Sequence, residues 1–242
     1  MGNKPGIEIR KYMDEAIGLG LFMASACFFG ALMEYHGLPF SQAIPSPLLR
    51  RFLVGLAMGL TALYIFTSRF GKQSGAYINP AVTLIHYRLG DIKIIDVVLY
   101  TVFQLIGGSL GVYVVYLLFP AWMRSQEVNY VITVPGKQGL VLAFLSESLI
   151  SFLLISVVLL MRLKKSWVTY TPFIVSMLIT LFITFEAPFS GMSMNPARTF
   201  ATAIIAGEWK SFWLYCSAPV LGMLAGELLY RKVKKIKHEK NV

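Results

Sequence analysis

Two copies of the motif Asn-Pro-Ala occur in the chain, at Asn79-Pro80-Ala81 and at Asn195-Pro196-Ala197. Asparagine is a preferred helix N-cap, because its side-chain oxygen accepts a hydrogen bond from a free N–H of the first turn. Proline is favoured at the first helical position, where its missing N–H costs nothing. Each motif therefore predicts a capped helix start whose asparagine keeps its amide N–H groups for another partner.

Both motifs lie in the same sequence frame, SGAYINPAVT from Ser74 to Thr83 and SGMSMNPART from Ser190 to Thr199. This repetition indicates a tandem duplication. Two such helix starts that face each other would bring together two amide donors and the positive ends of two helix dipoles. A water oxygen between them would accept hydrogen bonds from Asn79 and Asn195, which breaks a chain of proton transfer, while the dipoles repel cations.

Three charged residues in or beside apolar sequence are further candidates for a functional role. Arg198 follows the second motif directly, and a guanidinium at a constriction offers donors to a polar permeant and repels cations. Glu15 and Glu147 each lie early in an apolar run upstream of one motif, where a carboxyl group is costly and therefore a functional candidate. An acid–base relay is one interpretation. We prefer a supporting role, in which each glutamate accepts hydrogen bonds from backbone N–H groups of a re-entrant loop.

The elements that must position these residues are membrane helices. Hydrophobic residues make up 56% of the 242 positions, and the mean hydropathy is +0.65. Most of the apolar runs reach the ~17–25 residues that a helix needs to cross a membrane; they lie at about 16–33, 51–67, 94–119, 139–161, 168–185 and 211–230. The segments after the two motifs are too short to cross, so they are predicted to be re-entrant, which is tolerated only inside protein or beside a water-filled cavity.

The predicted fold is therefore an all-α membrane protein with six transmembrane helices and two re-entrant half-helices. Three spans per repeat require the second copy to enter the membrane inverted. Matching G-x-x-x-G pairs, Gly107/Gly111 and Gly222/Gly226, predict close helix packing in both copies. We expect one channel-forming domain over residues 1–242, with repeats at about 12–119 and 139–230 and a basic tail at 231–242. The connections at 34–50 and 120–138 are predicted to carry no chemistry of their own.

The net charge of +10 reflects topology rather than a nucleic-acid partner. Sixteen of the 22 basic residues flank the spans on one side, which places both termini in the cytoplasm by the positive-inside rule. Cys27 and Cys216 fall inside spans and predict no disulfide. The histidines, which are His36, His86 and His238, have neither metal-ligand spacing nor a triad arrangement, so no metal site, cofactor or enzyme activity is expected.

With these residues the chain resembles the major intrinsic protein family, which comprises aquaporins and aquaglyceroporins. The resemblance extends from Glu15 to about Gly226 and rests on the paired motifs, Arg198 and the two glutamates. It implies an aquaporin-like fold, a pore within each protomer, a homotetramer in a cell membrane, and passive conduction of water or small neutral solutes.

The selectivity ring that the resemblance implies is located by counting from the motifs, which gives Gly59, Ile183, Met192 and Arg198. This set matches neither the usual water-selective nor the usual glycerol-conducting pattern, and it predicts a permissive ring. A register shift of one residue would instead bring Met58 or Leu60, or Phe182 or Thr184, to the pore. Thr199 and the pair Phe212-Trp213 are more typical of water channels, so we expect mainly water conduction.

Other possibilities stay open at this point. The first is a channel of the same family for glycerol, urea, ammonia or metalloid hydroxides. The second is an ion-coupled secondary transporter, which also uses inverted repeats and broken helices. A structural protein whose pore has closed is the third.

Overall fold

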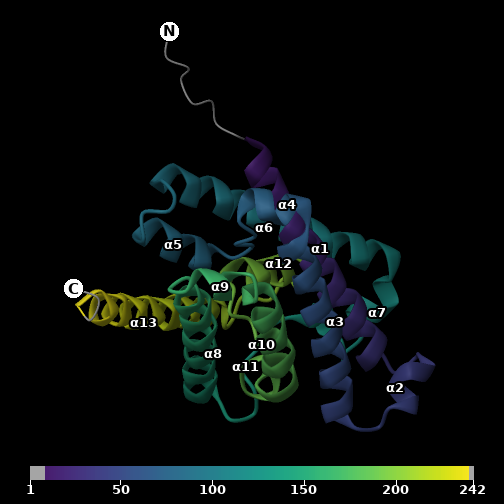
Figure 1. Cartoon of the computed structure of the whole chain (residues 1–242). Helices are drawn as coiled ribbons and strands as arrows, with labels where there is room; N and C mark the ends of the chain where they lie inside the picture. Colours follow the sequence, from purple (N-terminus) through teal and green to yellow (C-terminus); the bar gives the residue numbers. More distant parts are fainter. Residues whose placement is uncertain (1–8, 240–242) are drawn as a thin grey trace.

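The computed structural model describes residues 9–239, and within that range all regular secondary structure is helical. Among the described residues, five helices are long and apolar enough to cross a membrane: α1 (Ile9–Glu34), α3 (Pro47–Thr67), α6 (Ile94–Leu118), α8 (Leu140–Met161) and α13 (Phe212–Glu239). The sixth predicted span is α10 (Thr171–Phe185), whose 15 residues extend over only about 22 Å. All six predicted runs thus correspond to helices (Figure 1).

Both motifs begin short helices, as predicted. These are α5 (Pro80–Arg88) and α12 (Pro196–Ala206). Each is preceded by a helix of one or two turns and an irregular segment, with α4 (Arg69–Ser74) before α5 and α11 (Ala187–Ser190) before α12. The remaining short elements lie in connections: α2 (Pro39–Ala43), α7 (Pro120–Arg124), the 3-10 turn η1 (Asn129–Val131) and α9 (Lys165–Val168).

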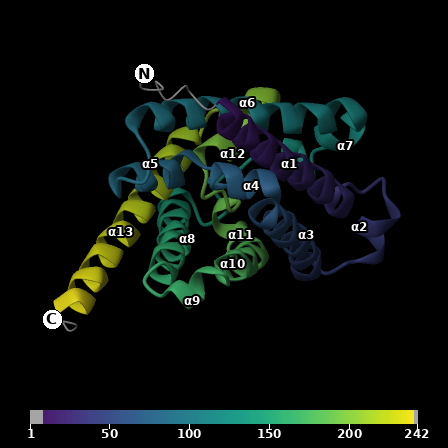
Figure 2. The same ribbon diagram turned by 45° about the horizontal axis from the view of Figure 1, so that its top comes forward.

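The helix pairing repeats between the two halves. In the first half α1 packs along α6, in the second α8 packs along α13, and α3 and α10 join the halves. Glycines allow the first two contacts, since a Cβ on Gly107 would collide with the backbone of Ala16 and one on Gly222 with that of Ser148. Figure 2 shows α12 inside the bundle, where it packs against α6, α13 and α1.

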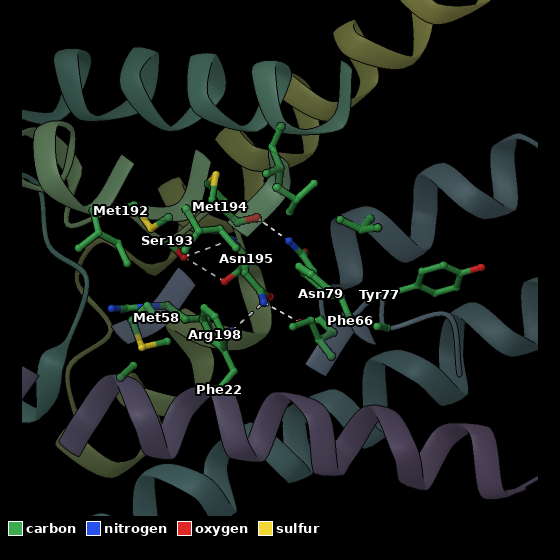
Figure 3. A pocket seen from close by; sticks show the side chains of 18 of the residues that line it. Phe22, Met58, Phe66, Tyr77, Asn79, Met192, Ser193, Met194, Asn195 and Arg198 are labelled. Atoms are coloured by element: carbon green, nitrogen blue, oxygen red, sulfur yellow. Dashed lines mark hydrogen bonds between the residues drawn. The ribbon is translucent and has the colours of Figure 1, made fainter. Parts of the chain in front are cut away.

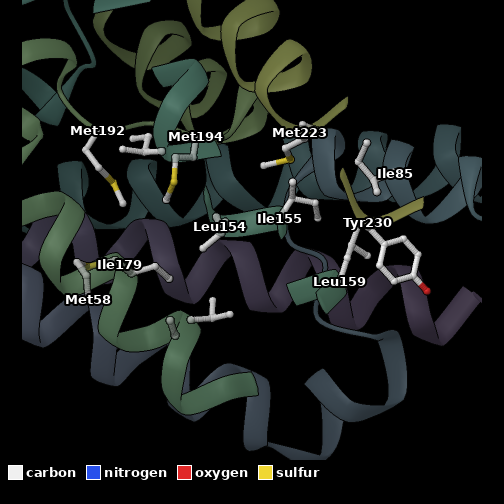
Figure 4. Packing of buried hydrophobic residues seen from close by; sticks show 14 of the residues in the cluster. Met58, Ile85, Leu154, Ile155, Leu159, Ile179, Met192, Met194, Met223 and Tyr230 are labelled. Carbon is white, nitrogen blue, oxygen red and sulfur yellow. The ribbon is translucent and has the colours of Figure 1, made fainter. Parts of the chain in front are cut away.

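The buried apolar side chains form two large clusters, and each includes residues of one half-helix. The first is centred on α1 and α6. The second joins α3, α8, α10 and α13, and it includes Met58, Ile179, Met192 and Met194 (Figure 4). Met192 and Met194 belong to the segment before α12, so this cluster also fixes the surroundings of the second motif.

The two ends of the bundle are distinguished by their polar contacts. On one end, which we call the terminal face, lie both described chain ends. Lys11 pairs there with Asp96, and Lys237 donates a hydrogen bond to the carbonyl of Leu163. The ion pair between Arg162 and Asp91 lies on the same face. The other end, the loop face, carries Glu34, Arg50 and the connection at 120–138. The predicted tail is not a separate segment, because residues 231–239 continue α13. Residues 1–8 and 240–242, including Lys4 and Lys240 of the charge pattern, lie outside the described range.

Candidate functional site

The two asparagines cap the two half-helices. Asn79 has an extended backbone (φ −158°), and its Oδ1 accepts a hydrogen bond from the N–H of Ala81 at 2.9 Å. Asn195 has the same conformation (φ −148°), and its Oδ1 accepts from Ala197 N at 3.0 Å and Arg198 N at 3.3 Å. The side-chain oxygens are thus used by the helix starts, which leaves the amide nitrogens for other partners.

Each amide nitrogen crosses to the opposite half of the molecule. Asn79 Nδ2 donates to the carbonyl of Met194 at 2.7 Å, and Asn195 Nδ2 donates to the carbonyl of Ile78 at 2.7 Å (Figure 3). A primary amide has two N–H groups, so each asparagine keeps one for the space beside it. The motifs therefore do more than the sequence indicated, since they also tie the two repeats together.

The two glutamates hold the segments that precede the motifs. Glu15 accepts hydrogen bonds from Tyr77 N (2.9 Å), Ile78 N (2.5 Å) and Gln104 Nε2 (2.8 Å). Glu147 accepts from the corresponding backbone groups, Ser193 N (2.6 Å) and Met194 N (2.7 Å). Both side chains are 0% exposed. This is the geometry of a supporting carboxylate that satisfies buried backbone donors.

The held segments have an unusual backbone that needs such support. Alternate residues have positive φ values, Ala76 at 48° and Ile78 at 40° in the first copy, Met192 at 50° and Met194 at 53° in the second. L-residues rarely adopt this left-handed region, which costs free energy at each position. The hydrogen bonds to Glu15 and Glu147 offset that cost and keep both segments irregular.

A cavity of about 650 Å³ passes through the molecule along these segments. At the terminal face it is lined by Lys72, His86 and Arg162, and at the loop face by Glu34, Arg51 and Ala187. Asn79 and Asn195 lie between these ends, and the two half-helix starts meet there. The cavity thus connects the two faces past both motifs.

Three of the four predicted ring residues line this cavity, and one does not. Ile183, Met192 and Arg198 are among the lining residues, whereas Gly59 is absent from the wall. A Cβ on Gly59 would point into α10, 2.8 Å from the carbonyl of Ser176. Its neighbour Met58 lines the cavity instead, as Arg198 does, and both are labelled in Figure 3. The prediction is corrected by one residue, because Met58 lies 21 residues before Asn79, one more than the count that selected Gly59.

Arg198 has a donor that no protein atom satisfies. Its side chain is buried, with 8% of the residue exposed, and its Nη1 has no hydrogen-bond partner among residues 9–239. Buried polar groups are almost always paired with protein or with an ordered molecule. Arg198 itself lies in the cavity wall, so its guanidinium group places a positive charge beside this part of the cavity.

Several residues that line the cavity belong to no motif, and they were not predicted from the sequence. Phe22, Ala26 and Gly30 line the cavity from α1, and Val131 lines it from η1. Thr133, in the same connection, shares a hydrogen bond with Thr199 (Oγ1–Oγ1 2.8 Å). The connection at 120–138, which we expected to carry no chemistry of its own, thus contributes a residue to the cavity wall. The spacing of Phe22, Ala26 and Gly30 by four marks one face of α1, but the sequence could not show that this face meets a cavity.

The terminal-face mouth is a charged network. Arg162 makes two hydrogen bonds to Asp91, at 2.7 and 3.1 Å, and His86 Nδ1 lies 2.8 Å from the same carboxylate. The bonds from Arg162 lower the pKa of Asp91, which keeps it ionised. Tyr77 stacks on His86 with ring centroids 4.3 Å apart. In the described part of the chain, no cluster of three or more His, Cys, Asp or Glu side chains could hold a metal ion.

Replacing Glu147 by glutamine is expected to destabilise the protein by at least about 2 kcal/mol. Glu147 accepts from Ser193 N, Met194 N and the Ser190 hydroxyl (2.7 Å), and an amide leaves one of these donors unpaired or facing another donor. The melting temperature of purified protein in mild detergent measures this. Glu208→Gln, an exposed carboxyl change on the loop face, is the control and should melt like the wild type. Equal melting temperatures for Glu147→Gln and wild type would show that the carboxylate is not an anchor.

Known proteins resemble this chain over nearly its whole length. The family model described as Major intrinsic protein matches residues 5–230. The chain is 32% identical to a probable aquaporin NIP-type of Nicotiana alata, over 93% of this chain and 78% of that protein. It is 30% identical to nodulin-26 of Glycine max over 93% and 78%, and 26% identical to aquaporin Z of Photorhabdus laumondii over 92% and 96%. The aquaglyceroporin structure from Plasmodium falciparum superposes with a TM-score of 0.79 at 21% identity, covering 93% and 96%.

Proposed function

Because the chain belongs to the major intrinsic protein family, we propose that its cavity conducts water and small uncharged solutes through a ring made of Met58, Ile183, Met192 and Arg198. Members of the family are passive membrane channels and not enzymes, and this protein is a channel of that kind. What we propose beyond this channel class is which residues form the selectivity ring and which molecules pass through it.

One observation carries the proposal, namely that the charged Arg198 lines the cavity together with the apolar side chains of Met58, Ile183 and Met192. A permeant that enters a narrow passage leaves part of its hydration, and it needs hydrogen-bond donors to compensate. Arg198 supplies them on one side, while Met58, Ile183 and Met192 cover the others without polar groups. Such a wall suits water and compact neutral molecules such as urea and glycerol, and the carbon chain of glycerol can face the apolar side.

We propose further that the asparagine pair excludes ions and protons. Each of Asn79 and Asn195 has one N–H left after bonding to the opposite half, and each caps a helix whose dipole is positive at that end. A water molecule that accepts from both is turned with its hydrogens away from the pair, so neighbouring waters cannot pass a proton through it. A cation meets two positive helix ends and Arg198.

The orientation and assembly belong to the same proposal. The basic residues of the terminal face favour the cytoplasm for both chain ends in a cell membrane. The long membrane-spanning helices carry many exposed apolar side chains, for example Leu60, Leu118 and Val141, which are 57%, 66% and 75% exposed. These faces suit lipid and neighbouring copies, and we propose a homotetramer in which each protomer has its own pore.

A substitution that narrows the ring tests whether Met58 belongs to it. In proteoliposomes followed by stopped-flow light scattering, Met58→Phe should lower glycerol and urea permeability about tenfold, since a small steric change in a closed pocket is worth 1–3 kcal/mol. Water, which is smaller, should lose much less. Met177→Phe is the control, because Met177 is 56% exposed on α10 away from the cavity.

Two outcomes would contradict the proposal. Equal effects of Met58→Phe and Met177→Phe would remove Met58 from the ring. Flux that saturates and requires a proton or sodium gradient would indicate a coupled transporter instead of a channel.

A further inference from the structure

A second buried acid lies beside the support of the second motif. Glu186 follows the last residue of α10 and is only 9% exposed. Its Oε1 is hydrogen-bonded to the hydroxyl of Ser190, and the same hydroxyl lies 2.7 Å from Glu147 Oε1. Two buried carboxyl groups therefore share one serine hydroxyl.

Counting hydrogens assigns the charge of each group. The Ser190 hydroxyl has one hydrogen and can donate to only one of the two carboxyls, so the other must donate to it. Glu147 accepts hydrogen bonds from two backbone N–H groups, which suits an ionised carboxylate. Glu186 has this one contact, and its Oε2 has no partner within residues 9–239. The proton therefore lies on Glu186 Oε1 and is donated to Ser190.

The internal repeat shows that this acid is an addition. Ser74 is the counterpart of Ser190, and the backbone carbonyl of each serine accepts a bond from a tyrosine hydroxyl, Tyr100 or Tyr215. Four residues before Ser190 is Glu186, whereas four residues before Ser74 is the apolar Phe70. The first copy holds its loop with a single glutamate, so the support does not require a second one.

The shared hydroxyl is connected to the ring. Ser190 Oγ also accepts the backbone N–H of Met192 at 3.1 Å, and Met192 has the left-handed φ of 50°. On the other side Glu186 is three residues after Ile183. Glu186 and Ser190 thus join the two elements that carry Ile183 and Met192.

We propose that Glu186 is a positioning residue for the ring, whose carboxyl proton holds the Met192 segment, so that permeability falls reversibly when Glu186 ionises at alkaline pH. Ionisation would leave two carboxylates with one hydroxyl hydrogen between them and would remove a donor from Ser190. The Met192 segment would then lose part of the support for its left-handed backbone, and relaxation would move the Met192 side chain into the passage. The inference rests on the proposed channel function.

The surroundings set the direction and range of the pH response. The groups that face Glu186 and Ser190 are Glu147 on α8 and the Tyr215 hydroxyl on α13, and Arg51 on α3 donates to the nearby carbonyl of Thr184. Burial and the charge of Glu147 raise the pKa of Glu186, which lies beyond the end of α10, to about 8. Because the folded pKa is raised, the stabilisation by the neutral acid is complete below the ordinary carboxyl pKa and is lost as pH rises through about 8.

The test compares wild type with Glu186→Gln in proteoliposomes over a pH range that spans the pKa of about 8. Water permeability of the wild type should fall in one single-proton transition near that pH and recover on return. Glutamine keeps a donor toward Ser190 and cannot ionise, so Glu186→Gln should match the wild type at neutral pH and lack the transition. Glu208→Gln, an exposed acid on the same face, should retain it.

An infrared measurement on the same samples is independent of flux. The wild type should show the carbonyl band of a protonated carboxylic acid, which titrates with the same midpoint and is absent in Glu186→Gln. An unchanged pH transition in Glu186→Gln, or an infrared band that this substitution leaves unchanged, would overturn the inference. If no variant conducted water or solute at any pH, the proposed function would fail, and the infrared band would still decide whether Glu186 holds the proton.

Discussion

Replacing Gly107 by alanine is expected to give a protein that no longer folds stably, with a loss of about 3 kcal/mol at the upper end of the range for overpacked cores. The added Cβ would collide with the carbonyl oxygen of Ala16 and would lie 2.5 Å from its Cα and carbonyl carbon. These are backbone atoms, which cannot move without displacing α1. Since Ala16 follows Glu15, the displacement would also pull the carboxylate away from Tyr77 and Ile78.

The next residue provides a matched control. A Cβ on Gly108 would meet only side-chain carbons of Ala201 and Leu19, at 3.2 Å, and these can adjust. Gly108→Ala should therefore cost about 1 kcal/mol or less. The melting temperature in detergent, and the fraction of the purified protein that is monodisperse, distinguish Gly107→Ala from Gly108→Ala. Equal behaviour would mean that α1 and α6 are not packed as closely as the structure shows.

The duplication extends the same prediction to the second half. Gly222 approaches Ser148, the residue after Glu147, in the way that Gly107 approaches Ala16. Gly222→Ala should therefore be as damaging as Gly107→Ala, and through the same route of displacing a supporting glutamate.

Replacing Arg198 by valine is expected to have the largest effect on selectivity. The substitution removes the only charged side chain of the proposed ring and leaves four apolar ones, so the passage widens and no longer repels cations there. Glycerol and urea permeability should rise by about tenfold or more, and a proton leak should become measurable with a pH-sensitive dye inside the vesicles. Folding should survive, because replacing a buried charge with an apolar side chain is often neutral for stability.

Arg198→Lys separates charge from shape. Lysine keeps the positive charge and should keep cations and protons out, but it lacks the planar group with several fixed donors. We therefore expect partial loss of solute discrimination with little proton leak. If Arg198→Val left both solute and proton flux unchanged, Arg198 would not belong to the narrowest part of the pore.

The elements were predictable because their signals are local. An asparagine cap and a proline act within one turn of helix, so Asn79 and Asn195 indicated the starts of α5 and α12 directly. Apolar runs of membrane length indicated the long helices for the same reason. The shortness of α10 was less visible, because the apolar sequence continues on both sides of a helix of 15 residues.

The ring was less predictable because it depends on helix rotation. Successive residues of a helix point about 100° apart, so a count that is wrong by one residue selects a different face. Gly59 packs on α10 and Met58 lines the cavity, and this follows from how α3 rests on α10. Glu186 was missed for a related reason. Its sequence position shows an acid at the end of a span, and only the fold brings it to Ser190 and Glu147.

By itself the sequence determined a duplicated membrane protein with two capped half-helices and one buried glutamate to support each, since repeats, caps and apolar runs are properties of neighbouring residues. The tertiary structure decided which side chains share the cavity, that each asparagine bonds to the opposite half, and that Glu186 faces a second carboxyl group. These are contacts between residues far apart in the chain. They depend on how closely glycines such as Gly107 and Gly222 let the helices approach and on the rotation that each helix adopts there.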